Sequence, residues 1–92
     1  MSERVLRGIT NRLCRNTLGG YLYGSAKQAH IPGHDIDILI VCHGHHKPRV
    51  RCQLALLQIS VDILIHAVLI SPEELSDNRA LQSILDDAER LW

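Results

Sequence analysis

The stretch from Gly24 to Asp37, GSAKQAHIPGHDID, decides the fold because it joins two short apolar runs and ends on two carboxylates. The runs are Gly20–Tyr23 before it and Ile38–Val41 after it. We expect a strand, a tight turn, a short helix, a turn and a second strand. Alternate side chains of a strand share one face, so Asp35 and Asp37 lie together, with Cα atoms about 7 Å apart.

These features predict a metal–nucleotide site. Neighbouring carboxylates repel each other unless a positive charge lies between them, and a divalent cation with oxygen ligands is the usual solution. Gly24 lets a ligand approach the backbone closely, and Ser25 can cap a helix whose first N–H groups bind an anion. Taken singly, Gly-Ser after a strand and Asp-x-Asp at a strand start also fit ordinary turn chemistry.

The order Gly-Ser, short spacer, Asp-x-Asp and apolar strand resembles the signature of the polymerase-β-like nucleotidyltransferase superfamily, and the small size resembles its minimal nucleotidyltransferases. The resemblance implies an α+β fold, a small mixed sheet flanked by helices. It also implies that Gly24 and Ser25 bind a triphosphate and that Asp35 and Asp37 bind Mg²⁺. Two features depart from the family pattern: Lys27-Gln28-Ala29, where many relatives have Arg-Gly, and His34, where a serine often stands.

A third acid is predicted on a third strand, which we place at Ile59–Ile65. Asp62 is a lone carboxylate in this apolar run, and an unpaired buried carboxylate is costly. In the family that the chain resembles, a downstream strand acid binds metal and acts as general base, and Val61-Asp62-Ile63 resembles that context. The alternative is an Asp in solvent at a strand edge. His66 would share the face of Asp62 only if the strand continued, so it is an accessory candidate.

An amphipathic helix is predicted from Ser2 to about Arg15, because Val5, Ile9 and Leu13 recur every four residues. Its arginines mostly lie off this apolar stripe. They form either a solvated face, which we favour, or a basic rim that attracts a nucleotide or an acidic partner; they are Arg4, Arg7, Arg12 and Arg15.

The sequence of the second half of the chain predicts a loop, three helices and a short final strand. The run His43-Gly44-His45-His46 lacks the spacing of a zinc site, so we expect a solvated loop, followed by a helix at about Pro48–Leu57. Ser71 can cap a helix and form a capping box with Glu74. A last helix is expected at about Asn78–Asp87, and Arg90–Trp92 can add a short strand with the tryptophan packed on the sheet.

Composition and length indicate one globular domain, residues 1–92. The formal net charge is zero, which argues against a protein that coats nucleic acid, and 46% of the residues are hydrophobic. No apolar run reaches the roughly 20 residues of a membrane span, and no signal peptide is visible. Three cysteines without metal-type spacing predict reduced thiols in a cytoplasmic protein.

By this resemblance, the expected activity is Mg²⁺-dependent transfer of a nucleoside monophosphate, with ATP favoured as donor, to a hydroxyl group. The resemblance also implies a helical HEPN-type partner, a toxin to which the chain adds AMP as an antitoxin. A partner or self-association would complete so small a site. One alternative is a non-catalytic nucleotide- or partner-binding subunit, which the family departures motivate. Another is a small-molecule nucleotidyltransferase of the antibiotic-modifying type.

Overall fold

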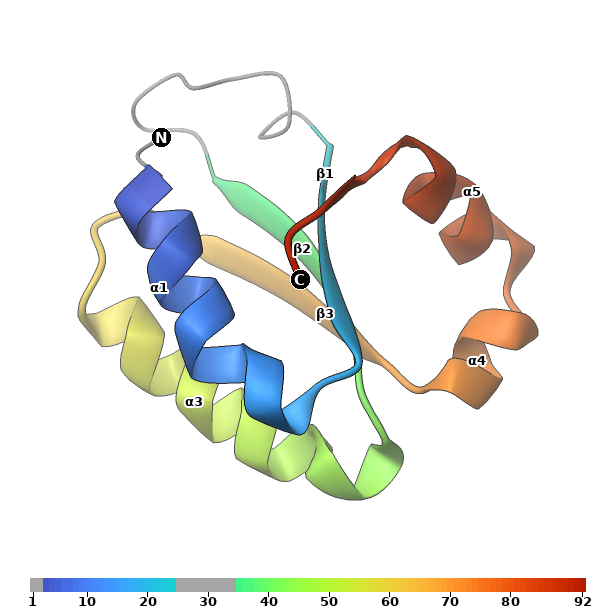
Figure 1. Cartoon of the computed structure of the whole chain (residues 1–92), viewed down its shortest axis with the longest axis horizontal. Helices are drawn as coiled ribbons and strands as arrows, with labels where there is room; N and C mark the ends of the chain where they lie inside the picture. The colour runs from blue at the N-terminus through green and yellow to red at the C-terminus, as the bar shows by residue number, and fades with distance from the viewer. Residues whose placement is uncertain (1–2, 25–34) are drawn as a thin grey trace.

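The computed structural model describes residues 3–24 and 35–92 and shows an α+β fold with a mixed four-stranded sheet flanked by helices (Figure 1). The strand order is β3-β2-β1-β4. Ser25 and the predicted short helix after it lie outside the described residues. The elements are α1 (Glu3–Leu13), η1 (Cys14–Asn16), β1 (Gly19–Tyr23), β2 (Ile36–Val41), η2 (Gly44–His46), α3 (Lys47–Ile59), β3 (Ile65–Ile70), α4 (Pro72–Ser76), α5 (Arg79–Asp87) and β4 (Glu89–Arg90).

Strand β2 is the centre of the sheet. It pairs antiparallel with β1, with Tyr23 opposite Asp37, and parallel with β3, with Asp37 opposite His66. The mixed sheet expected from the sequence is therefore confirmed. Because β2 has a neighbouring strand on each side, the side chains of its first residues lie beside the last residue of β1 and the first residues of β3.

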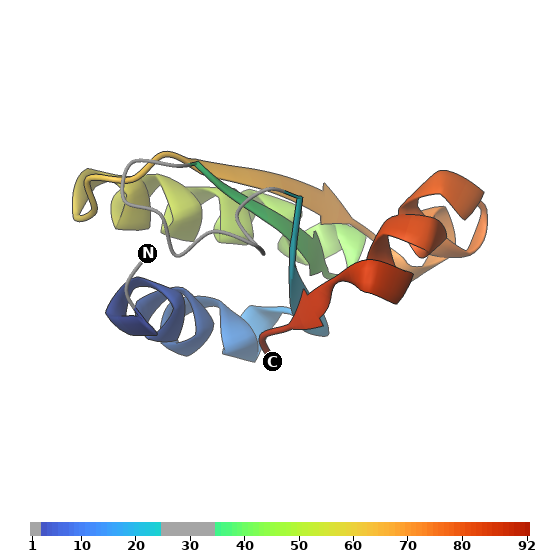
Figure 2. The same cartoon turned by 90° about the horizontal axis from the view of Figure 1, so that it is seen from above.

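The two faces of the sheet bury different side chains. Ile36, Ile38 and Ile40 are fully buried against α1 and α3, whereas Leu39 and Val41 face the other way, toward α4 and α5. Figures 1 and 2 show α1 and α3 at one end of the molecule and α4 and α5 at the other, with the strands between them. The alternation predicted for the second strand is confirmed.

Helix α1 is amphipathic, as the sequence predicts. Ile9 and Leu13 are fully buried in the core beside Ile36 and Ile38. The four arginines of α1 and η1 are exposed, which fits the solvated face that we favour; they are Arg4, Arg7, Arg12 and Arg15. Leu6 and Val5 pack at the edge of the same core.

The predicted third strand was wrong in its position. Ile59 is the last residue of α3, and β3 begins only at Ile65. The helix ends where the backbone N–H and the hydroxyl of Ser60 both donate to the carbonyl of Leu57. Gln58 then bridges the turn, because its side chain donates to the carbonyl of Ile63 and accepts from the N–H of Ile65. These side-chain contacts stabilise a turn after α3, so the strand begins at Ile65 and not at Ile59.

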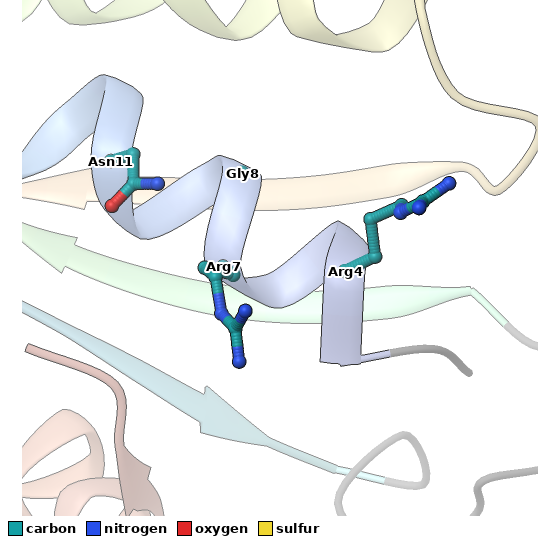
Figure 3. Close-up of a pocket in the computed structure, with 4 residues that line it drawn as sticks. All are labelled: Arg4, Arg7, Gly8 and Asn11. Carbon is teal, nitrogen blue, oxygen red and sulfur yellow. The ribbon is translucent and has the colours of Figure 1, made fainter.

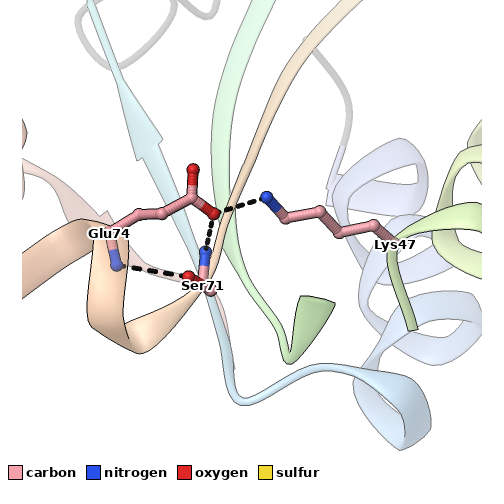
Figure 4. Close-up of polar contacts among 3 residues, drawn as sticks. All are labelled: Lys47, Ser71 and Glu74. Atoms are coloured by element: carbon pink, nitrogen blue, oxygen red, sulfur yellow. Dashed lines mark hydrogen bonds and ion pairs between the residues drawn. The ribbon is translucent and has the colours of Figure 1, made fainter. Parts of the chain in front are cut away.

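The helix start at Ser71 is confirmed. Ser71 Oγ accepts a hydrogen bond from the N–H of Glu74, and the Glu74 carboxylate accepts one from the N–H of Ser71 (Figure 4). Lys47, at the start of α3, donates to the same carboxylate. These contacts hold the pKa of Glu74 at about 2, below its ordinary value of 4.5, with the Lys47 hydrogen bond as the largest cause. They connect α4 to α3 across the sheet end.

The last residues fold back over β1. Trp92 is half-buried against the core, and its ring N–H donates to Thr17 Oγ1 at 2.7 Å. A Cβ atom on Gly20 would overlap the Trp92 ring, so the glycine is required by this close approach. The predicted packing of the tryptophan is confirmed, whereas the final strand expected at Arg90–Trp92 lies one residue earlier, as β4 at Glu89–Arg90. Among residues 3–24 and 35–92, the longest apolar helix is still too short and too polar to cross a bilayer.

Gly20→Ala should displace Trp92. We expect a loss of about 1–3 kcal/mol of unfolding free energy from overpacking, and a red shift of tryptophan emission as the ring becomes hydrated. Trp92 is the only tryptophan in the chain, so fluorescence during denaturant unfolding reports both effects. Gly8→Ala is the matched control, because a Cβ there meets no described atom within 4 Å. Unchanged emission in Gly20→Ala would contradict the docking of Trp92.

Glu74 should make stability depend on pH between about 4.5 and about 2. Its folded-state pKa is depressed, so its contribution is complete above about 4.5 and is lost as pH falls through about 2. Glu74→Gln keeps the hydrogen-bonding shape but not the charge. The difference in Tm between wild type and Glu74→Gln should therefore shrink across this window. Glu73→Gln, on the same turn but without a described ion pair, should show no such trend.

Candidate functional site

Asp35 and Asp37 lie at the beginning of the central strand. Asp35 immediately precedes β2, and Asp37 is its second residue. Both belong to the sheet face that carries Leu39 and Val41, opposite the buried isoleucines. Helices α4 and α5 cover Leu39 and Val41, whereas Asp35 is exposed and Asp37 is half-buried. The two carboxylates therefore stand on the accessible part of this face.

Gly24 packs closely against the Asp37 carboxylate. It has the backbone angle φ +71°, in the left-handed region, and a Cβ atom at this position would lie 2.9 Å from Asp37 Oδ2. Any other residue would be strained by its backbone and would press on the carboxylate. The glycine that the sequence singled out is thus required by both the turn and the neighbouring acid.

His66 joins the carboxylates from the adjacent strand. It is the register partner of Asp37, and its Nε2 atom lies 2.9 Å from Asp35 Oδ2. Both side chains are about half exposed, at 51% and 52%. Sequence reasoning gave His66 only an accessory role because it started the third strand too early. The run Ile63–Ile70, apolar except for His66, is the sequence signal for the later strand.

The field of Asp37 reaches β1. The pKa of Tyr23, opposite Asp37 across the strand pair, is raised by burial and, to a smaller extent, by the charge of Asp37. The phenol therefore stays protonated and can serve only as a neutral neighbour of the acid. The charge of Asp37 therefore acts on a side chain of the neighbouring strand β1.

Asp62 does not lie on a strand. It occupies the bend between α3 and β3 and is exposed. The bend is at the same end of the sheet as Asp35, because Leu64 accepts a backbone hydrogen bond from Ile36 at 2.9 Å. The strand position beside Asp37, where we had placed an acid by resemblance, holds His66 instead.

The carboxylate oxygens present suit a cation whose remaining ligands are water and substrate. In the part of the chain that the structure describes, no three histidine, cysteine or acidic side chains converge closely enough to hold a metal ion. Mg²⁺ typically binds through one or two carboxylates, several waters and substrate phosphates. Asp35 and Asp37, both with solvent-accessible side chains, fit this kind of binding.

The histidine run after β2 forms a surface turn. Gly44–His46 is one turn of 3-10 helix. The rings of His43 and His45 stack with centroids 5.8 Å apart, and those of His45 and His46 are 4.1 Å apart. Burial and these neighbouring histidines lower the pKa of His46. The expected solvated turn is confirmed.

A cavity of about 420 Å³ lies on the outer side of α1 and is lined by Arg4, Arg7, Gly8 and Asn11. This side of the helix is opposite Ile9 and Leu13, so it is separated from the carboxylates by the core. Figure 3 shows the two guanidinium groups extending from the helix in different directions. They do not converge on a common point, and the arginines are not part of the carboxylate site.

Comparisons with known proteins support the fold. No family model and no curated protein matches the sequence. Among solved structures, the chain is similar to one from a crystal structure of the toxin–antitoxin MntA–HpeT, in a mutant with two aspartate-to-glutamate changes two positions apart. The TM-score is 0.54 at 15% sequence identity, and the match covers 100% of this chain and 73% of the other. At this identity, the likeness shows a shared α+β fold.

Proposed function

We propose that this protein transfers a nucleoside monophosphate, with ATP as the favoured donor, to a hydroxyl group in a Mg²⁺-dependent reaction. The observation that carries the proposal is the pair Asp35 and Asp37 on one accessible face, with Asp37 packed against a left-handed glycine turn at Gly24. Carboxylates on the central strand next to a tight backbone turn are suited to a metal-bound triphosphate.

The structural neighbour gives independent support. It is a mutant toxin–antitoxin in which two aspartates, two positions apart, are changed to glutamate. Asp35 and Asp37 have the same spacing in this chain.

Each residue has a defined role in the proposed reaction. Asp35 and Asp37 hold Mg²⁺, which supplies charge neutralisation for the triphosphate and its leaving group. Gly24 gives the phosphates access to the backbone, and Ser25 donates to them. Asp62, in the bend between α3 and β3 at the same end of the sheet, takes the proton of the attacking hydroxyl. Positioning and charge neutralisation account for most of the rate.

The acceptor that we propose is a hydroxyl on a partner protein, a HEPN-type toxin, so that the chain acts as its antitoxin. The similarity to a chain from a toxin–antitoxin supports a protein partner. The carboxylate face supports it as well, because Asp35, His66 and Val68 remain exposed on it. A partner covering this face would exclude water from the reacting groups.

A non-catalytic nucleotide-binding subunit is the second candidate. The observation that favours it is His66 at the strand position where an acid was expected, with Asp62 displaced into the bend. Such a subunit would bind nucleotide without turnover. The two candidates differ in whether the function requires Asp62.

Asp37→Asn should abolish nucleotidyl transfer and leave the fold intact. The amide is isosteric but cannot neutralise a cation, so we expect a loss on the order of 10²–10³ or more in kcat. The measurement is the transfer of radiolabelled AMP to the partner or to a protein lysate, with circular dichroism as the folding check. Asp87→Asn, an exposed acid on α5, is the matched control and should retain full activity. Full activity in Asp37→Asn would exclude the metal role.

Calorimetric titration should detect ATP binding that requires Mg²⁺. Wild type should bind Mg²⁺–ATP, and the double variant Asp35→Ala/Asp37→Ala should lose the binding because both carboxylate ligands are gone. Asp62→Asn separates the two candidate functions. Both predict that the variant still binds nucleotide. Only the enzyme predicts nucleotidyl transfer by the wild type that the variant loses. Binding that persists in EDTA would contradict a metal-bound nucleotide.

A further inference from the structure

Strand β3 is an edge of the sheet, and its pairing with β2 shows which backbone groups point outward. Leu64 and Ile70 direct their carbonyls to β2, where they accept from Ile36 and Cys42. In a parallel pair, the N–H and C=O of one residue point to the same side and alternate along the strand. Even-numbered residues of β3 therefore face β2, and Ile65, Ala67 and Leu69 face away from it.

One side chain covers only the start of this edge. Gln58 accepts from the N–H of Ile65 at 2.7 Å and donates to the carbonyl of Ile63 at 2.8 Å. Both groups point outward, which agrees with the alternation. Beyond Gln58, the N–H and C=O groups of Ala67 and Leu69 have no hydrogen-bond partner in residues 3–24 and 35–92. Two donors and two acceptors are left in a row.

The edge lacks the usual protection against pairing. Natural edge strands are shielded by charged residues, proline or bulges. The six residues of β3, IHAVLI, include no lysine, arginine, acid or proline. Of the five exposed large hydrophobic side chains among the described residues, Val68 lies on this strand and Leu64 immediately precedes it. The formal net charge of zero gives two copies no overall repulsion.

We propose that β3 pairs antiparallel with β3 of a second copy of this chain, around a two-fold axis at Val68. Ala67 then lies opposite Leu69 of the second copy, and Leu69 opposite its Ala67. Each pair exchanges two hydrogen bonds, so the outward groups of both residues are all satisfied. Hydrogen-bonded pairs alternate with non-hydrogen-bonded pairs, which places Val68 opposite its own counterpart. This self-complementary pattern favours a second copy over an unrelated strand.

The pairing has a consequence for the carboxylate face. The axis is perpendicular to the sheet, so both copies present Asp35 and Asp37 on the same side of one continuous eight-stranded sheet. His66 lies opposite Ile70 of the second copy. The second copy therefore borders the site one strand away from β2. The proposal stands on the edge geometry and does not depend on the proposed activity.

Cysteine cross-linking tests the register. In a Cys14→Ser/Cys52→Ser background, Val68→Cys should form a disulfide-linked dimer of twice the 10.4 kDa chain mass under mild oxidation. Opposed Cα atoms at a non-hydrogen-bonded position are about 4.5 Å apart, within disulfide range. Leu64→Cys is the control: it is also exposed, but its two copies would be about 26 Å apart and should not link. Linking through Leu64→Cys, or none through Val68→Cys, would overturn this register.

Light scattering of unmodified protein tests the dimer itself. Wild type should have twice the chain mass over a wide concentration series, and Val68→Lys should be monomeric because it places like charges opposite each other. Leu18→Lys, a change at another exposed hydrophobic residue away from β3, should remain dimeric. Circular dichroism checks that each variant is folded. A monomeric wild type, larger open-ended assemblies, or a Val68→Lys dimer would each refute the proposed pairing.

Discussion

The burial of every second side chain of β2 is the constraint on which the rest of the structure depends. Ile36, Ile38 and Ile40 are fully buried against α1 and α3, so a shift of one residue would turn all three away from this core and turn Asp37 into it. The same alternation places Asp37 on the opposite face. Hydrophobic burial on one side of the strand therefore determines the position of the acid on the other.

Neighbouring elements leave the acids accessible at one end of this face. Helices α4 and α5 cover Leu39, Val41 and Ile70, at the far end of β2 and β3. The capping box of α4 and the Lys47 ion pair keep α4 at that end. Asp35, Asp37 and His66 lie at the uncovered end, where a nucleotide or a partner protein can reach them.

Strand β3 serves both the site and the proposed dimer. Its residues that face β2 place His66 beside the carboxylates, and its alternate residues leave Ala67 and Leu69 at the open edge. Because one strand contributes to both, the second copy would lie beside the carboxylate site.

The sequence by itself determined the first two strands, the amphipathic helix α1, the start of α4 and the position of the two carboxylates. Strong local signals were present in each case: the apolar alternation of Ile36–Ile40, the amphipathic spacing of α1, the Ser71 cap and the glycine turn before two acids. Such signals depend on neighbours in the chain, so they can be recognised without the fold.

Only the tertiary structure decided where β3 begins and which residue stands beside Asp37. The apolar residues from Ile59 to Ile70 allow a strand at either end, and period-two alternation cannot choose between them. Gln58 and Ser60 settle the choice through contacts with the turn and with β3. Consequently His66, and not Asp62, is the strand neighbour of Asp37, because pairing register comes from contacts between segments distant in the sequence.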